Sequence, residues 1–487
     1  MLQPEVTFVI PYREFLRLLR SLLAQPYHVA LGPMGVKATN GQLELLLRHF
    51  QLVPEAEVAA RGRELASRFE MAFSPHPLLR PRCWEALALT LQRREDNREP
   101  EPTAACYLLL GNPPEEAGAF SGFLARGEEI RPVRQLKIVG PGMYRIPAVD
   151  FKGNAGGEDR AIGQSGNSAI RQRSAQLLQP PEERWSRVQG ALGAENWRRL
   201  TSLRFALAGV GRTGSLVATS LAKMGVRWLA LVDPDRLEEP NLDAMDSVTS
   251  ADLGRFKVEV LADNLAQECP WTQFLPLPRS VLTSEAVALL KGADVLICCV
   301  DNDAARLFVG ALACLYHQPL LDIGTGVFHS ALSHHVQAEE REGQLPYPRA
   351  GSPIPSDLGA DVRLILPGDG CLLCAGGVAD LARAQAELHS QLPNSPVASF
   401  PQTNEWWRER AGSLRSLNQI AVHLGLNLLE NLMVGRLQSS VWLRWEVAED
   451  GQPRLQTHSV SSAEGCPLCA LAGRGDVRGV NAEASPG

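Results

Sequence analysis

Short apolar runs alternate with helical stretches through the second half of the chain. Runs at 204–208, 228–232 and 293–300 predict buried strands, and the stretches between them have the spacing of amphipathic helices. A sheet in which strands and helices alternate is typically parallel, with helices on both faces. The pattern therefore predicts an α/β fold with a Rossmann-like, doubly wound and mostly parallel sheet.

The first 150 residues have shorter and less regular apolar runs. Four of these runs predict strands or extended segments, at 5–10, 43–53, 106–110 and 133–139. Leucine and phenylalanine recur at helical spacing over 13–25, which predicts an amphipathic helix. We expect a smaller α+β domain over residues 1–151.

A polar, glycine-rich stretch that ends in Pro180 and Pro181 predicts a flexible linker over 152–181. The second domain then covers 182–475. Its last elements are predicted by an apolar helical segment at 414–433 and by a strand pair near 441–447 and 453–460. From about Gly473 the residues become small and polar, so we expect fraying there and a disordered tail over 476–487.

Composition narrows the class of protein. Of 487 residues, 45% are hydrophobic and 21% are charged, as in folded globular chains. The net charge of -6 argues against nucleic-acid or anionic-membrane binding. The sequence has no membrane-spanning apolar run and no signal-peptide pattern, so we expect a cytoplasmic protein. Ten cysteines in a reduced compartment indicate metal ligands where they cluster.

A glycine-rich loop lies between the strand at 204–208 and the helix that follows it. Gly209, Gly211 and Gly214 form a GxGxxG motif, and the next strand ends in Asp233. Glycines permit a tight turn and close approach of the backbone to a phosphate, and an acidic residue at this distance suits a ribose hydroxyl. The loop alone leaves NAD, ATP or a plain turn in an α/β sheet open.

Five further motifs stand in order around this loop: RWSR at 184–187, DPDRLEEPNL at 233–242, Lys257, DNDAAR at 301–306 and DIGTG at 322–326. Together they resemble the adenylation domain of the ThiF/MoeB/ubiquitin-activating enzyme superfamily over residues 182–470. The resemblance implies that ATP and magnesium are used to adenylate the C-terminal glycine of a ubiquitin-like or sulfur-carrier protein. It also implies a homodimer.

The resemblance implies a role for each matching residue. Lys257 would neutralise phosphate charge, Asp301 would hold magnesium, Asp233 would bind ribose, and Arg187 would reach into the neighbouring protomer's site. The other matches at the nucleotide are Asp235, Asn241 and Arg306. Taken singly, Asp301 can be a helix cap and the cations can be surface residues, whereas their joint placement favours the site.

One segment departs from the family pattern. Where the family continues Asn-Leu-x-Arg-Gln, this chain has Ala244 and Met245 in place of the arginine and glutamine. Arg212 and Arg255 are the candidate replacements for the missing cation. The departure keeps a second hypothesis open, in which the chain is a catalytically impaired adaptor that binds partner proteins. An NAD-dependent oxidoreductase is a third.

Two CxxC pairs predict a structural zinc site. Cys371 and Cys374, with Cys466 and Cys469, supply the four thiolates of a closed tetrahedral site, and a redox CxxC is the alternative. Residues 375–465 contain no cysteine, although family members that form a thioester place their nucleophile there. The chain therefore either stops at the adenylate or uses a hydroxyl, for which the candidates are Ser395, Ser399 and Thr403.

The N-terminal region resembles a JAB/MPN-type isopeptidase domain in its strand order and in the segments 120–122 and 135–140. An active domain of this type needs a His-x-His-Pro motif with a following Ser and Asp, whereas this chain has only His76 before Pro77. We expect the domain to be inactive and to serve docking or dimer contacts. Its fusion to the adenylation domain favours a bacterial ubiquitin-like conjugation pathway, with a conjugating enzyme as a further partner.

Overall fold

The computed structural model describes the chain in eleven stretches: 5–25, 28–39, 42–54, 57, 71–73, 123–126, 129–147, 182–327, 358–390, 414–447 and 451–476. Several predictions lie outside these residues, namely the strand at 106–110, the linker at 152–181, His76 and the three hydroxyl residues Ser395, Ser399 and Thr403.

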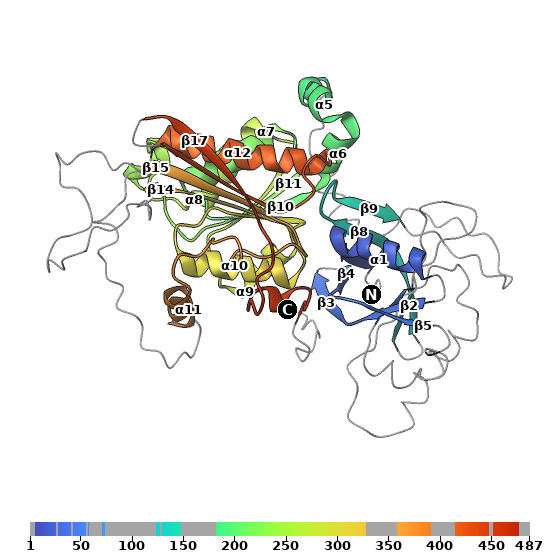
Figure 1. Ribbon diagram of the computed structural model, residues 1–487. Coiled ribbons are helices and arrows are strands. Elements are labelled where there is room, and N and C mark those ends of the chain that lie inside the picture. Colours follow the sequence, from blue (N-terminus) through green and yellow to red (C-terminus); the bar gives the residue numbers. More distant parts are fainter. Residues whose placement is uncertain are drawn as a thin grey trace, which may run out of the picture.

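The N-terminal residues form a mixed sheet with one long helix against it (Figure 1). The elements are β1 (Glu5–Pro11), α1 (Tyr12–Ala24), β2 (His28–Gly32), β3 (Met34–Thr39), β4 (Gln42–Leu47), β5 (Gln51–Pro54), β6 (Met71–Phe73), β7 (Phe123–Arg126), β8 (Glu129–Val139) and β9 (Tyr144–Pro147). The strand order is β3-β4-β1-β8-β7, with β9 beside β8, and β5-β2-β6 form a second small sheet. Phe8, Ile10 and Leu45 are fully buried between the layers.

The second unit contains a larger sheet crossed by helices. Its helices are α5 (Ser186–Leu192), α6 (Ala194–Ser202), α7 (Arg212–Lys223), α8 (Lys257–Glu268), α9 (Ser284–Lys291), α10 (Asp303–Leu315), α11 (Leu381–Ser390) and α12 (Arg415–Met433). Its strands are β10 (Arg204–Ala208), β11 (Trp228–Val232), β12 (Gln273–Leu277), β13 (Val295–Cys298), β14 (Leu320–Val327), β15 (Leu358–Ile365), β16 (Val441–Val447) and β17 (Pro453–Ser459). Short 3-10 helices lie at Glu182–Trp185, Glu239–Asn241, Ser250–Asp252 and Cys469–Leu471.

The eight strands follow the order β12-β11-β10-β13-β14-β15-β16-β17. The first five strands pair in parallel and the last three pair antiparallel. Helices α7 and α12 cover one face of this sheet, and α9 and α10 cover the other (Figure 1). All of β13, and all of β10 and β11 except their first residues, is buried, because helices exclude water from both faces. The prediction of an α/β fold with a mostly parallel, Rossmann-like sheet is confirmed.

Of the predictions of single elements, some are confirmed and others differ from the structure. The helix at 414–433 is α12, and the predicted strand pair is the β16–β17 hairpin. The predicted strand at 293–300 shortens to β13, because the buried Asp294 carboxylate precedes it and the chain turns after Cys299 towards α10. Helix α11, at 381–390, was not foreseen. Among the described helices, none is both long and apolar enough to cross a membrane.

The N-terminal unit lies against the edge of the large sheet at which β10 and β13 begin. The buried Asp294 accepts a hydrogen bond from the backbone N–H of Arg204, the first residue of β10, at 3.0 Å. The same carboxylate pairs with two cations of the N-terminal sheet, Lys137 at 2.7 Å and Arg145 at 2.6 Å. Since parallel strands share a direction, the glycine loop after β10 lies at the opposite edge of the sheet.

Candidate active site

The glycine loop joins β10 to α7 and has no room for side chains at two of its glycines. Gly209 has a φ of 85°, and a Cβ there would lie 2.6 Å from the carbonyl oxygen of Cys299. A Cβ on Gly214 would lie 2.1 Å from the carbonyl oxygen of Gly209. Gly211, by contrast, faces open space within the described residues. The loop therefore packs tightly against the turn after β13 while leaving its outer side open.

Helix α7 begins inside this loop, and within the described part of the chain no side chain caps its first turn. Its N-terminal N–H groups are consequently available to a ligand, and their partial positive charge favours an anion such as a phosphate. The helix starts at Arg212, and the last glycine of the motif, Gly214, already lies in its first turn.

Asp233 holds the loop in shape from the end of the neighbouring strand. One carboxylate oxygen accepts from the N–H of Val210 at 2.6 Å, and the other accepts from the N–H of Asp235 at 2.8 Å. Burial raises the pKa of Asp233, while the positive charge of Lys257 opposes this shift. Each oxygen still has a lone pair for a ligand hydroxyl, so the predicted ribose contact is chemically available.

Lys257 is the first residue of α8 and points back to the strand end that carries Asp233. Its Nζ lies 2.8 Å from the Oδ2 of Asp235, and its side chain is only 10% exposed. The backbone N–H of Lys257 also donates to the carbonyl oxygen of Asp235 at 3.0 Å. The structure thus brings three predicted residues together beside the glycine loop, namely Asp233 and the ion pair of Lys257 with Asp235.

Asp301 lies just beyond β13, where its exposed side chain faces solvent next to Asn302. Asn302 caps α10 by accepting from the N–H of Ala305 at 2.8 Å, which fixes the turn that carries Asp301. The carboxylate is therefore held at the same edge of the sheet as the loop, since β13 runs parallel to β10. It offers the hard oxygen ligands that a divalent cation prefers.

Arg306 points into the protein and not towards the glycine loop's open side. Its guanidinium pairs with the fully buried Asp322 at 2.6 Å and donates to the carbonyl oxygen of Val300 at 2.7 Å. Arg363 pairs with the other oxygen of Asp322 at 3.1 Å. The side chain of Arg306 is 12% exposed, and its contacts in the structure stabilise the turn after β13.

Asn241 supports the loop that follows β11. Its Oδ1 accepts from the N–H of Glu238 at 2.9 Å, which closes a capping box around a short 3-10 helix. The contact that the structure describes for Asn241 therefore supports this loop. Three residues later Ala244 is buried.

The two arginines proposed as replacements for the cation missing at position 244 are engaged elsewhere. Arg212 pairs with Asp243 at 3.0 Å and donates to the carbonyl oxygen of Pro240 at 2.8 Å. Arg255 pairs with Asp252 at 3.1 Å and with a second carboxylate on α8.

A third arginine, Arg415 at the start of α12, reaches position 244 instead. It donates to the carbonyl oxygen of Ala244 at 2.9 Å and pairs with Asp246 at 2.5 Å. Sequence reasoning missed Arg415 because it lies 171 residues further along the chain.

Arg187 is exposed on α5, the short helix that projects from the rest of the molecule in Figure 1. Its neighbour Arg184 stacks over the ring of Trp271 at 4.6 Å, and Trp185 donates to the carbonyl oxygen of Lys223 at 2.8 Å. The RWSR motif therefore anchors α5 to the body through Arg184 and Trp185 and leaves Arg187 on the outside.

The two CxxC pairs come together, as predicted, after β15 and β17. The Sγ atoms of Cys371 and Cys374 lie 3.6 Å apart, those of Cys371 and Cys466 lie 3.4 Å apart, and those of Cys374 and Cys469 lie 3.6 Å apart. All four lie within 4.8 Å of one another. Four sulfurs at zinc–sulfur bonds of about 2.3 Å form a tetrahedron with edges of about 3.8 Å, so these thiols fit the ion.

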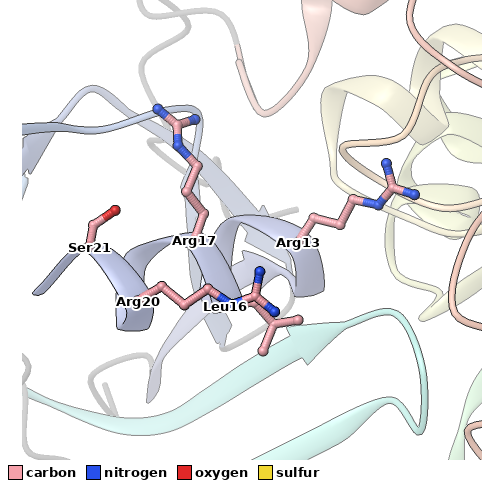
Figure 2. Close-up of a pocket in the computed structure, with 5 residues that line it drawn as sticks. All are labelled: Arg13, Leu16, Arg17, Arg20 and Ser21. Carbon is pink, nitrogen blue, oxygen red and sulfur yellow. The ribbon is translucent and has the colours of Figure 1, made fainter. Parts of the chain in front are cut away.

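A hollow elsewhere on the molecule has none of the predicted site residues in its lining. It lies along the outer side of α1, where Arg13, Arg17 and Arg20 project from successive turns (Figure 2). Arg13 pairs with Asp369 at 2.6 Å, and Arg17 pairs with Glu14 and stacks over a phenylalanine ring. Two of its three arginines thus already have partners within the chain.

Known proteins share part of this chain. Residues 186–374 match the model of the ThiF family. The adenylyltransferase and sulfurtransferase uba4 of Aspergillus clavatus is 31% identical over 147 residues, which cover 30% of each chain. The ubiquitin-like modifier-activating enzyme 5 of Drosophila pseudoobscura pseudoobscura is 28% identical over 198 residues, which cover 37% of this chain and 48% of that protein.

Among solved structures, E. coli MccB with ATP aligns with a TM-score of 0.42 at 16% identity, covering 59% of this chain and 74% of that one. The chain spans less than half the length of the two curated relatives named above. The matched segment contains the glycine loop, Asp233, Lys257 and Asp301, and ends at the second cysteine of the first CxxC pair. The comparisons therefore show that residues 186–374 are similar to the ThiF family.

Proposed function

We propose that this protein is an ATP-dependent adenylyltransferase that activates the C-terminal glycine of a ubiquitin-like or sulfur-carrier protein. The observation that carries the proposal is the cluster at the carboxyl edge of the sheet. There the uncapped start of α7, the loop-bound Asp233 and the Lys257–Asp235 pair stand beside the turn that holds Asp301. The curated relatives that match this segment are named as adenylyltransferases or as a modifier-activating enzyme.

In the proposed reaction an oxygen of the carrier's terminal carboxylate attacks the α-phosphorus of ATP. A new oxygen–phosphorus bond forms, the bond between the α-phosphorus and the bridging oxygen breaks, and pyrophosphate leaves with that electron pair. The N–H groups of α7 and the ammonium of Lys257 stabilise the charge that develops on the phosphate oxygens. Asp233 orients the ribose, and the carboxylate of Asp301 would hold magnesium, which would supply positive charge to the phosphate oxygens.

The Lys257–Asp235 pair gives the lysine two states. In the described structure its ammonium is neutralised by Asp235 at 2.8 Å and is held close to the buried Asp233. A bound triphosphate competes with Asp235 for the same ammonium, because phosphate oxygens carry more charge than a carboxylate. We infer that the ion pair with Asp235 keeps the Lys257 side chain oriented towards the site until the nucleotide binds.

The four cysteines supply the second part of the proposal, a structural zinc site. With four protein ligands the ion has no open position, and its contribution is to tie the segment after β15 to the segment after β17. Both segments pack around Leu307 of α10 and around Leu468. Zinc would thereby hold the segment after β17 against α10, the helix that follows Asp301.

The wider biological setting belongs to the same proposal. We infer a cytoplasmic homodimer of a bacterial ubiquitin-like conjugation pathway, in which Arg187 of each protomer completes the other site and a conjugating enzyme takes the activated carrier. The exposed position of Arg187 on the projecting α5 supports an intersubunit role. The N-terminal unit serves as a non-catalytic docking or dimer-contact domain, which its place at the opposite edge of the sheet supports.

A second candidate function is a catalytically impaired adaptor that binds the same partners. It is favoured by one observation, the neutral and buried Ala244, beside which Arg415 is already paired with Asp246. A cation held in this ion pair contributes less to a developing negative charge than an unpaired one. The adaptor would bind ATP and carrier without releasing pyrophosphate.

ATP–pyrophosphate exchange separates the two functions. The purified protein is mixed with a small ubiquitin-like carrier, and exchange of labelled pyrophosphate into ATP is measured with and without the carrier's terminal glycine. Adenylation predicts exchange that requires the glycine and that falls at least about 100-fold in Asp301→Ala and Lys257→Ala. The matched controls are Asp263→Ala and Lys223→Ala, whose side chains are 62% and 57% exposed on outer helix faces.

The controls should exchange at the wild-type rate. Equal loss in the controls and in the site variants would mean that the variants act through folding and would refute the assigned roles. ATP binding by calorimetry without any exchange, with the carrier shown to bind, would refute adenylation and establish the adaptor.

A further inference from the structure

Residues 473–476 do not fray, contrary to the prediction for the start of the tail, and residues 477–487 lie outside the described residues. Residues 473–476 pass between the two units and bond to both. The N–H of Gly473 donates to the carbonyl oxygen of Cys314 at 3.0 Å, and the N–H of Gly475 donates to that of Leu315 at 3.0 Å. The prediction failed because the partners of this small, polar segment belong to distant parts of the chain.

On its other side the segment adds to the edge of the N-terminal sheet. Gly475 forms a parallel bridge with Val36 of β3, and the N–H of Asp476 donates to the carbonyl oxygen of Val36 at 2.7 Å. A Cβ on Gly475 would lie 2.2 Å from that oxygen, and a Cβ on Gly35 would lie 1.9 Å from the carbonyl oxygen of Gly473. Backbone therefore packs directly on backbone, which the glycines on both sides permit.

The Asp476 carboxylate closes the contact with donors from both units. The Nζ of Lys291 at the end of α9 lies 2.6 and 2.7 Å from its two oxygens, and the hydroxyl of Tyr316 donates at 2.8 Å. From β3, the N–H of Ala38 donates at 3.0 Å. Burial and the neighbouring carboxylate raise the pKa of Tyr316, so its hydroxyl remains a donor.

The same segment starts only four residues after a predicted zinc ligand. Cys469 opens a short 3-10 helix, the N–H of Ala472 donates to its carbonyl oxygen at 3.1 Å, and Gly473 follows. A hydrogen-bonded turn joins the cysteine to the interface, because the N–H groups of the three residues after Cys469 donate to carbonyl oxygens of residues 466–469. A change in the position of Cys469 is therefore transmitted to residues 473–476.

We propose that residues 473–476 are an interdomain latch that binds the edge of β3, and that zinc in the four-cysteine cluster holds this latch in place. The proposal rests on the zinc site proposed above, but it does not depend on adenylation. Loss of the ion frees the Cys466–Cys469 turn, withdraws Asp476 from Lys291, and opens the β3 edge of the N-terminal sheet. The contacts of Asp294 with Lys137 and Arg145 remain, so the units stay associated while β3 loosens.

Hydrogen exchange on the full-length protein tests the latch, with bound zinc measured on the same samples. Asp476→Asn removes the charge and keeps the size of the side chain, and Glu464→Gln removes a nearby exposed charge as the matched control. We expect amide exchange in β3 to rise about tenfold in Asp476→Asn, because a charged hydrogen-bond acceptor for Ala38 is lost. Zinc content and exchange in the central strand β11 should stay at wild-type values, and the control should match the wild type.

Chelation tests the link to the metal. Removal of zinc from the wild-type protein should raise exchange in β3 to the level of Asp476→Asn, and added zinc should reverse the change. In Asp476→Asn itself chelation should add little, since the latch is already open. The latch is refuted if Asp476→Asn exchanges like the wild type, and the metal link is refuted if zinc leaves without any change in β3 or if the purified protein holds no zinc.

Discussion

His317 makes the contact between the two units sensitive to acid. Its ring is buried at the interface, and its Nε2 lies 2.5 Å from the carbonyl oxygen of Leu47 at the end of β4. A carbonyl oxygen only accepts, so the neutral ring carries its hydrogen on Nε2. Burial, together with the nearby positive charge of Arg48, lowers the pKa of His317 from 6.5 to about 4, while the hydrogen bond to Leu47 opposes this shift.

The sign of the pH effect follows from this lowered pKa. In the unfolded chain the imidazole takes up a proton below pH 6.5, whereas in the folded protein it resists protonation until about pH 4. The contribution of His317 to the free energy of unfolding is therefore fully present above pH 6.5 and falls as the pH drops from 6.5 towards 4. A pH of 5 is about 1.5 units below the pKa of the imidazole in the unfolded chain. At 1.36 kcal/mol per unit, the free energy of unfolding therefore falls by about 2 kcal/mol.

Urea unfolding at pH 7 and pH 5 measures this loss. Because many carboxylates also titrate in this range, the wild-type protein is compared with His317→Gln, which can still donate to Leu47 and cannot be protonated. We expect the wild type to lose about 2 kcal/mol more than the variant between the two pH values. An equal loss in both proteins would show that His317 is not a buried neutral donor and would refute the reasoning.

Three further predictions follow from single contacts. Asp294→Ala removes the nearer carboxylate of the buried Lys137, which keeps Glu44 at 3.6 Å, and should lower the free energy of unfolding by about 3 kcal/mol in urea titrations, and a loss below about 1 kcal/mol would contradict a buried pair. Gly214→Ala should weaken ATP binding in calorimetry at least about tenfold because its Cβ would meet Gly209 at 2.1 Å, whereas Gly190→Ala, in open space on α5 and outside the loop, should bind like the wild type. Thr283→Ala removes the cap of α9 and should cost about 1 kcal/mol in thermal unfolding, and no change would show that the cap is dispensable.

Much of the candidate site could be found from the sequence because its parts are local. The glycines of the loop are needed for contacts within five residues or with the adjacent strand, and Asp233 binds the loop from the next strand of a repeating strand–helix pattern. The CxxC spacing of the cysteines is by itself sufficient to predict a metal site. In each case residue type, order and short separation suffice, since neighbouring parallel strands must end at the same edge of the sheet.

Local patterns do not reveal which side chains pair after packing. Arg306 has the residue type of a phosphate ligand, yet it pairs with Asp322, which only the packing of β14 against α10 brings within 2.6 Å. Arg415 reaches Ala244 across 171 residues, and neither residue carries a local signal for the other. The two arginines that sequence order favoured were already neutralised by nearby carboxylates.

The sequence by itself determined the class of the large sheet, the glycine loop and the grouping of the four cysteines. These features depend on the period of the hydrophobic residues, on the conformational freedom of glycine and on the spacing of metal ligands, each of which is a property of a short segment of sequence. Only the tertiary structure decided which carboxylates pair with Arg306 and Lys137, that the N-terminal unit docks at the edge opposite the glycine loop, and that Gly473 to Asp476 are bound. Those outcomes depend on which charges and backbone groups meet after folding, because a buried charge or N–H takes whichever partner the packing brings to it.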